Sequence, residues 1–241
     1  MLSPLTAASA SGGLGKRVER EGKMFRQGRG LGVSRRAALV AAAGGASLAI
    51  GNGGFGGANA QTVNQTTTYL LFQAGVNVQT VTQLLSAVTQ AQTNEVYLAI
   101  STLGGEVMAG ITAYNFLRGL PKQLTTHNIG NIDSIGNAIF LAGEKRFASS
   151  HATFMFHGVG RPVAQNTTLS TNNLVELLNA NRADEKRIGD IIKGRTKLTL
   201  DQVTKFFQEA KTMDAAEALD VGIVDKVAEI QMPAGARIVI Q

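Results

Sequence analysis

The chain contains no cysteine in its 241 residues. Disulfide bonds, thiolate metal sites and a cysteine nucleophile are therefore excluded. The three histidines are scattered at positions 127, 151 and 157, and none belongs to a His-x-x-x-His pair of the kind that binds metal on a helix. The apolar run over residues 37–50 is shorter than the roughly 20 residues that a membrane-spanning helix needs. We expect neither a metal site nor a membrane span.

A broad basic surface is also missing. The formal net charge is +6 at pH 7, but residues 1–60 carry eight basic side chains and two acidic ones, which accounts for the whole surplus. The remaining 181 residues hold 15 side chains of each sign. Proteins that bind phosphate backbones concentrate lysine and arginine on one face. We therefore expect no nucleic-acid partner.

The basic segment at residues 1–60 resembles a twin-arginine export signal. An arginine pair at 35–36 directly precedes the apolar run over 37–50, and small residues at 58–60 fit a peptidase cleavage site. This resemblance predicts a mature protein that begins near Gln61 and is periplasmic or secreted. The alternative is a disordered, glycine-rich basic tail on a cytoplasmic protein.

Strands and helices alternate along the rest of the chain. The apolar patterns predict strands over residues 69–72, 96–100, 124–129, 146–147, 153–156 and 223–227, and helices over residues 78–92, 107–117, 135–142, 170–193, 200–207 and 214–220. Such alternation favours an α/β fold of parallel strands joined by right-handed crossovers. We expect a polar lead-in over 61–68, one domain over 69–230 and a C-terminal tail over 231–241.

Ser134 stands where a predicted strand meets a predicted helix. A serine at this place is either a helix cap or a nucleophile, and a nucleophile needs a base and oxyanion donors. The Ile135 amide and the turn at Gly104-Gly105 could donate, and His157 ends a strand at the same edge of the sheet. Each signal has a structural alternative: the serine could be a helix cap, and a histidine at a strand end is commonly structural.

The combination resembles the proteolytic subunit of Clp protease. The oxyanion turn of that family, Ser-Pro-Gly-Gly, matches TLGG at 102–105, and its nucleophile motif, Ala-Ser-Met-Gly, matches DSIG at 133–136. Its base motif, Met-Ile-His-Gln-Pro, matches MFHG at 155–158, and a final match follows in MDAAEALDVGIVDKV at 213–227. The resemblance covers roughly residues 69–228.

The resemblance implies a serine endopeptidase without a cofactor. Ser134 would be the nucleophile, His157 the general base, and the amides of Gly105 and Ile135 the oxyanion hole. The implied fold is a Clp-protease/crotonase-like layered β-sheet with crossover helices and a long protruding handle helix, here about residues 170–193. The family is related to the crotonases, so a crotonase-type acyl-CoA enzyme is one alternative.

The resemblance also implies an assembly. Family members form seven-membered rings of identical subunits, stacked in pairs, which enclose the active sites and receive peptides or unfolded proteins. A cytoplasmic protein would receive its substrates from an ATP-driven unfoldase. An exported protein would work without one, because ATP is absent outside the cytoplasm.

The chain departs from the family pattern at several positions. Ala210 stands where the family has the acid that orients the histidine, and Glu209 and Asp214 are the possible substitutes. Asp133 replaces a small residue beside the serine, and it is either a helix cap or a charge near the histidine. Leu103 replaces the proline of the glycine turn. The loss of the acid leaves a catalytically silent scaffold as a second alternative.

Lys145 offers a different base. A serine–lysine dyad operates in signal peptide peptidase A, whose fold is related. A lysine base must be buried to lose its proton near neutral pH, and a lysine that follows a helix is commonly exposed.

Overall fold

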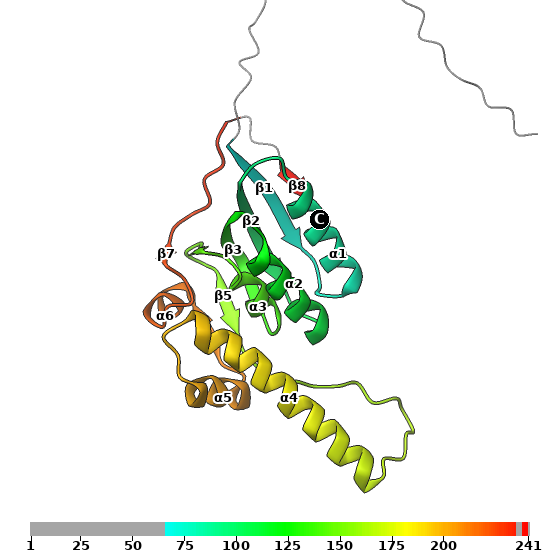
Figure 1. The fold of residues 1–241 in the computed structure, drawn as a ribbon. Helices are drawn as coiled ribbons and strands as arrows, with labels where there is room; N and C mark the ends of the chain where they lie inside the picture. Colours follow the sequence, from blue (N-terminus) through cyan, green and yellow to red (C-terminus); the bar gives the residue numbers. More distant parts are fainter. Residues whose placement is uncertain (1–65, 235–237, 241) are drawn as a thin grey trace, which may run out of the picture. The chain divides into compact units, whose positions relative to one another are not determined.

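The computed structural model describes residues 66–234 and 238–240. The predicted export signal at residues 1–60 lies outside this part of the chain. Within it, strands and helices alternate as the apolar pattern predicts (Figure 1).

Eight strands form one mixed sheet in the described residues. The strands are β1 (Thr67–Gln73), β2 (Glu95–Thr102), β3 (Gln123–Asp133), β4 (Lys145–Ala148), β5 (Thr153–Met155), β6 (Thr212–Asp214), β7 (Lys226–Val227) and β8 (Ile238–Ile240). Their order is β6-β5-β3-β2-β1-β8, with β4 paired to both β3 and β7. Every pairing is parallel except that of β5 with β6. The predicted α/β class with parallel strands is confirmed.

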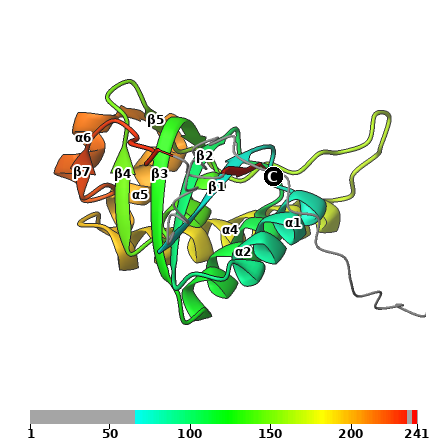
Figure 2. The same cartoon turned by 90° about the horizontal axis from the view of Figure 1, so that it is seen from above.

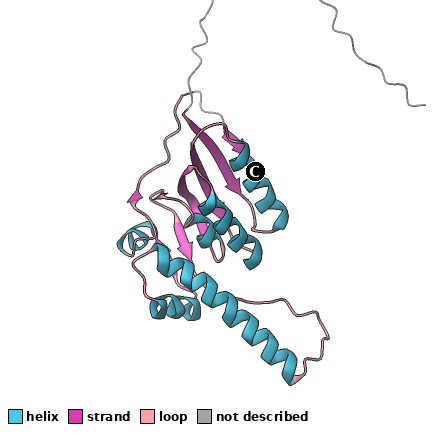
Figure 3. Cartoon of the chain, in the orientation of Figure 1, coloured by secondary structure: helices cyan, strands magenta, loops and turns pink. Residues whose placement is uncertain are grey.

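Six helices connect or flank these strands in the described part (Figures 2 and 3). They are α1 (Val78–Gln90), α2 (Val107–Gly119), α3 (Gly136–Phe140), α4 (Thr171–Arg195), α5 (Leu200–Glu209) and α6 (Ala215–Asp220). All five residues of α3 are buried, as expected for a helix that is apolar on every side. The buried residues of α4 lie only in its second half, and its first half projects beyond the sheet (Figure 1). The predicted handle helix is therefore present.

Polar residues fix where four of the helices begin. Asn77, Ser170, Thr199 and Asp214 each accept a hydrogen bond from a backbone amide three residues later, and the residue there bonds back to the cap amide. This capping box satisfies two of the amides that a helix start leaves unpaired. Asp214 is thus the N-cap of α6.

The length of β3 creates the edge at which the candidate residues meet. β3 pairs with β4 through residues 125–128 and with β5 through residues 131–133. Thr102 of β2 stands beside Ile132, and Asp133 stands beside Met155. The carboxyl ends of β2, β3 and β5 therefore lie together, which is where open α/β sheets bind their ligands.

Three pairings differ from the prediction. The segment expected as a C-terminal tail contains β8, which pairs with β1. Residues 212–214 form β6, which apolar periodicity missed because the strand has only three residues. Within the predicted strand 223–227 only Lys226–Val227 pairs, although Ile223 and Val224 are buried. Sheet pairing at these places is set by distant partners and not by the local pattern.

Tyr97, His127 and Ser149 form a polar chain beside the core. The Tyr97 hydroxyl lies 2.5 Å from His127 Nδ1, and Ser149 Oγ lies 3.3 Å from His127 Nε2. Burial, with a smaller effect of Tyr69, raises the pKa of Tyr97 to about 12. Burial also lowers the pKa of His127, although the Ala228 backbone and Glu229 oppose the shift. Tyr97 therefore keeps its proton, and its hydroxyl donates a hydrogen bond to Nδ1 of a neutral imidazole.

We predict that His127 makes folding sensitive to acid. The unfolded chain takes up a proton on this histidine near pH 6.5, before the folded chain does, so the unfolded state binds more protons and stability falls as pH drops below this value. Each unit of pKa depression contributes about 1.4 kcal/mol. The melting temperature of the wild type should fall more steeply between about pH 7.5 and about pH 5.5 than that of His127→Gln. Parallel slopes for the two proteins would contradict the prediction.

Candidate active site

Ser134 occupies a left-handed turn between β3 and α3. Its φ angle is 55°, which costs a non-glycine residue about 1 kcal/mol or more. The Ser134 amide donates to the Met155 carbonyl at 2.8 Å. The N-cap of α3 is Ile135, which makes no side-chain capping bond, so the Ser134 hydroxyl does not cap this helix. The helix-cap interpretations of Ser134 and Asp133 are both wrong, because Asp133 instead accepts a hydrogen bond from Asn131 Nδ2 at 3.0 Å.

The glycine turn after β2 lies directly against Ser134. Gly104 and Gly105 have φ angles of 81° and 149°, a region that favours glycine. A Cβ atom on Gly104 would lie 2.7 Å from Ser134 Cβ, and one on Gly105 would lie 2.2 Å from the Val76 carbonyl oxygen. Both positions therefore need glycine. The bridge between Val76 and Gly105 holds the backbone of this turn, so a proline is not needed where Leu103 stands.

Two backbone amides are free beside the serine hydroxyl. Within residues 66–234, the amides of Gly105 and Ile135 donate to no protein acceptor. Gly105, Ser134, Ile135 and His157 all line one cavity of about 60 Å³, whose other walls are mainly apolar side chains of α2, α4, α5 and the segment after β5. This volume corresponds to about two water molecules. A wider cavity of about 490 Å³ shares Gly105, Val107, Val159 and Gly160 with it.

His157 follows β5 and is exposed. Its Nδ1 atom lies 2.7 Å from the Gly158 carbonyl oxygen. A carbonyl oxygen only accepts hydrogen bonds, so Nδ1 carries the hydrogen and the neutral ring keeps the lone pair on Nε2. Nε2 is the nitrogen that can take a proton from a serine hydroxyl. No Ser134–His157 hydrogen bond is present between these two described residues, and such bonds commonly tighten only when substrate binds.

Neither proposed substitute acid contacts His157. Glu209 is exposed, with Oε1 3.7 Å from Lys205 Nζ, and Asp214 is occupied as the cap of α6. Ala210 is the left-handed C-cap of α5. Among the described residues no carboxylate forms an ion pair with His157. The imidazole is oriented by a backbone carbonyl.

Asn137 holds the serine turn, and the sequence analysis missed it. Its side chain is fully buried, and Nδ2 donates to the carbonyls of Ser134 at 3.0 Å and Met155 at 2.9 Å. It thus ties the Ser134 turn to the strand that precedes His157. A single amide inside the apolar segment 135–142 was the available signal, because a buried polar side chain needs partners.

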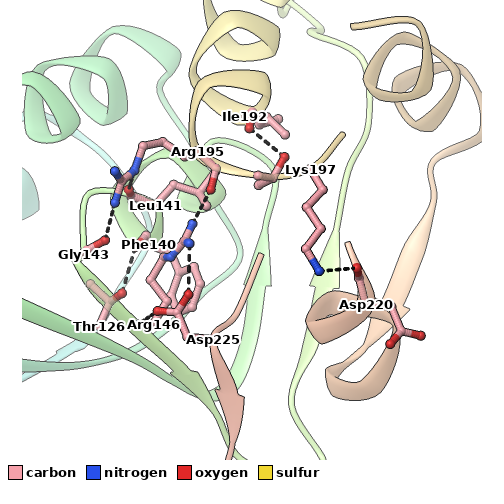
Figure 4. A network of polar contacts seen from close by, with 11 residues as sticks. Thr126, Phe140, Leu141, Gly143, Arg146, Ile192, Arg195, Lys197, Asp220 and Asp225 are labelled. Atoms are coloured by element: carbon pink, nitrogen blue, oxygen red, sulfur yellow. Dashed lines mark hydrogen bonds and ion pairs between the residues drawn. The ribbon is translucent and has the colours of Figure 1, made fainter. Parts of the chain in front are cut away.

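Arginines hold the other end of α3 (Figure 4). Arg195 donates to the carbonyls of Leu141 at 3.1 Å and Gly143 at 2.7 Å, where the helix leaves acceptors unpaired. Burial, together with the charges of Arg118 and Arg146, lowers the pKa of Arg195 from its usual value. Arg146 in turn donates to the Arg195 carbonyl and pairs with Asp225. These bonds hold the segment that follows α3, and the bonds of Asn137 hold the turn that precedes it.

Lys145 does not reach the site. It is exposed and begins β4 beside Thr125, nine residues before Ser134 along β3. The serine–lysine alternative is therefore wrong for this residue. In the part of the chain that the structure covers, no group of three or more histidine, aspartate or glutamate side chains is placed to hold a metal ion. No helix there is both long and apolar enough to cross a membrane.

Comparison with known proteins agrees with the fold. The sequence matches the Clp protease family over residues 69–231. The ATP-dependent Clp protease proteolytic subunits of two Lactococcus lactis subspecies, cremoris and lactis, are each 28% identical over 153 residues, covering 62% of this chain and 75% of theirs. A mutant of ClpP1 from Listeria monocytogenes has a similar structure, with a TM-score of 0.58 and 21% identity, over 68% of this chain and 92% of that one.

We predict that Asn137→Ala and Asn128→Ala differ at the serine. Both amides are fully buried and donate to β5, Asn137 to Met155 and Asn128 to Thr153 at 2.8 Å. Each substitution removes buried side-chain hydrogen bonds and should lower the free energy of unfolding by about 1–3 kcal/mol. Only Asn137→Ala should slow the reaction of Ser134 with a fluorophosphonate, measured as a labelling rate. Equal slowing in both variants would show that Asn137 has no special role.

Proposed function

Because the chain belongs to the Clp protease family, we propose that it is a serine endopeptidase. Ser134 is the nucleophile, His157 the general base, and the amides of Gly105 and Ile135 the oxyanion hole. One observation carries this proposal: two free backbone amides share a cavity with a strained serine turn and a histidine. Strain, a base and unpaired donors rarely gather for a structural purpose alone.

The proposed acylation uses each of these groups once. His157 Nε2 takes the hydroxyl proton as Ser134 Oγ attacks the peptide carbonyl carbon. The carbonyl oxygen becomes an oxyanion, which the amides of Gly105 and Ile135 stabilise by hydrogen bonds. His157 then gives the proton to the leaving nitrogen, the C–N bond breaks, and an ester on Ser134 remains.

Deacylation repeats these steps with water. His157 takes a proton from water, and the resulting hydroxide attacks the ester through a second oxyanion. The proton returns to Ser134 Oγ as the acid product leaves. Loss of one oxyanion donor typically costs about 10²–10³ in turnover, so the exact placement of the two amides matters.

The wider cavity supports peptides as the substrates. It joins the catalytic cavity through the glycine turn and the residues after His157, two backbone segments that an extended peptide could follow. Its outer walls include Glu106, Met108 and Arg161. A cleft of about 490 Å³ accommodates a few peptide side chains, in the size range of ordinary ligand pockets.

The proposed assembly is a ring of identical subunits, stacked in pairs through α4. The projecting half of α4 exposes Leu174, Val175 and Leu178, with Leu174 and Leu178 one turn apart on the same face. Large apolar side chains gathered on a projecting helix favour contact with another protein surface. The Lactococcus relatives are named ATP-dependent, and a cytoplasmic form of this protein would use an unfoldase in the same way.

Export is proposed from the sequence alone. The arginine pair at 35–36 and the apolar run at 37–50 support it. An exported form would accept peptides or unfolded chains without ATP. N-terminal sequencing of the protein from its own cells tests this proposal, since a chain that still carries residues 35–50 would contradict cleavage.

We predict that a fluorophosphonate labels the wild type on Ser134. Ser134→Ala should abolish labelling and lower peptide hydrolysis by about 10⁴-fold or more, and His157→Ala should lower both rates by a similar factor. Mass spectrometry of the labelled peptide locates the adduct. A folded wild type without labelling would favour the silent scaffold, and an activity on acyl-CoA that survives Ser134→Ala would favour the crotonase alternative.

We predict that Leu178→Glu weakens the assembly. A carboxylate in an apolar contact between α4 helices must lose its hydration, which costs several kcal/mol when it stays unpaired. Sedimentation velocity should show smaller particles for Leu178→Glu than for the wild type. Asn179→Glu is the control, since it adds the same charge at the adjacent exposed position. Equal dissociation of both variants, or of neither, would contradict a contact at Leu178.

A further inference from the structure

The segment after β5 replaces the missing acid with a backbone carbonyl. The Gly158 carbonyl accepts the hydrogen bond of His157 Nδ1, so the direction of this one peptide group decides the direction of the imidazole. A peptide group next to an exposed histidine turns freely unless other bonds hold it. Three bonds surround it: the Phe156 amide to the Lys211 carbonyl at 2.8 Å, the Gly158 amide to the Phe207 carbonyl at 3.0 Å, and the Val159 amide to Glu185 Oε1 at 3.0 Å.

Glu185 supplies the only side chain among these three bonds. The peptide group between Gly158 and Val159 contains both the carbonyl that holds His157 and the amide that donates to Glu185. Since a peptide group is planar, fixing its N–H also fixes its C=O. A hydrogen bond to a carboxylate is stronger than one to a neutral acceptor. Glu185 therefore acts on the imidazole through one rigid plane.

The surroundings of Glu185 leave its carboxylate available for this bond. Glu185 is half-buried in the second half of α4, and it forms no ion pair with any described residue. It lines a cavity of about 300 Å³ between α4 and α5, with Gly158 and Phe207 in the wall. Phe207 lines both this cavity and the cavity that contains Ser134 and His157.

Gly158 makes room for this carboxylate. A Cβ atom on Gly158 would lie 2.9 Å from Glu185 Oε1, so any other residue at this position would push the glutamate away. The resembling family motif has glutamine here. The change from glutamine to glycine at position 158 therefore leaves space for the Glu185 carboxylate. At the position of the family's usual acid, this chain has Ala210.

We propose that Glu185 is the positioning residue of this active site. Glu185 holds the peptide group between Gly158 and Val159, and the carbonyl of this group orients His157. An orienting acid would instead bond directly to the histidine. The proposal rests on the proposed serine peptidase function. It assigns no contact between Glu185 and the substrate or the reacting atoms.

The test compares Glu185→Ala with Glu185→Gln. A glutamine side-chain oxygen still accepts from the Val159 amide, so Glu185→Gln should keep kcat within about threefold of the wild type. Glu185→Ala loses the acceptor and should lower kcat for a short peptide about 10- to 100-fold, with KM changed less than about threefold. Equal losses in both variants would overturn the proposal, because Glu185 would then act through its charge.

Gly158→Ala is an independent variant. Its methyl group meets the flexible end of Glu185, so it should displace the carboxylate without unfolding the chain. Gly158→Ala should lower kcat as Glu185→Ala does, and the double variant should be no slower than either single one. Additive losses would contradict a shared mechanism. Glu209→Ala and Lys186→Ala are the controls and should leave kcat unchanged. Both side chains are exposed, and they form ion pairs elsewhere, Glu209 with Lys205 and Lys186 with Asp190.

A spectroscopic measurement separates this proposal from the proposed function. In protein labelled with ¹⁵N-histidine, the wild type and Glu185→Gln should show His157 as the Nδ1–H tautomer, and Glu185→Ala should show a mixture of tautomers. His157→Gln identifies the signal among the three histidines. An unchanged tautomer in Glu185→Ala would overturn the positioning role, even in an active enzyme. A wild type that fails to label at Ser134 would instead overturn the peptidase function.

Discussion

The hydrogen bond from the Ser134 amide to the Met155 carbonyl joins the two halves of the candidate active site. It continues the pairing of β3 with β5 by one residue, into a turn whose φ angle of 55° would otherwise be unfavourable for serine. Asn137 donates to the carbonyls on both sides of this connection. The Gly104 turn then packs against Ser134 so closely that a methyl group would not fit. The Ser134 turn, the glycine turn and β5 are therefore joined by direct contacts.

Burial of α3 is the cost of this arrangement. A five-residue helix surrounded by apolar side chains leaves polar groups at both ends without water, and each unpaired group costs about 1–3 kcal/mol. Arg195 meets the need at the C-terminal end by donating to the Leu141 carbonyl, whereas at the other end the Ile135 amide has no protein acceptor within residues 66–234. Arg195 itself is held by Arg146, whose charge is balanced by Asp225, the residue directly before β7. The helix that follows the Ser134 turn is thus connected, through side chains, to the C-terminal half of the domain.

Orientation of the histidine does not require a carboxylate beside it. An acid in a serine–histidine site fixes the tautomer and stabilises the imidazolium that forms. The Gly158 carbonyl provides the first of these effects, and it provides less of the second because it carries no full charge. A protein built this way should be a slower hydrolase than one with a complete triad.

The sequence by itself determined the fold class, the long helix near residues 170–193, the apolar helix after Ser134 and the glycine turn at 104–105, because apolar periodicity and glycine turns are local properties. It also predicted Ser134 and His157 as site residues, through the resemblance of three short motifs to those of the Clp protease family. Only the tertiary structure decided that Ser134 does not cap a helix, that Asp133 bonds Asn131, and that His157 is oriented by the Gly158 carbonyl. Glu185 lies 28 residues after His157, on a helix whose position depends on packing. Contacts between residues so far apart follow from the three-dimensional fold, and no local pattern encodes them.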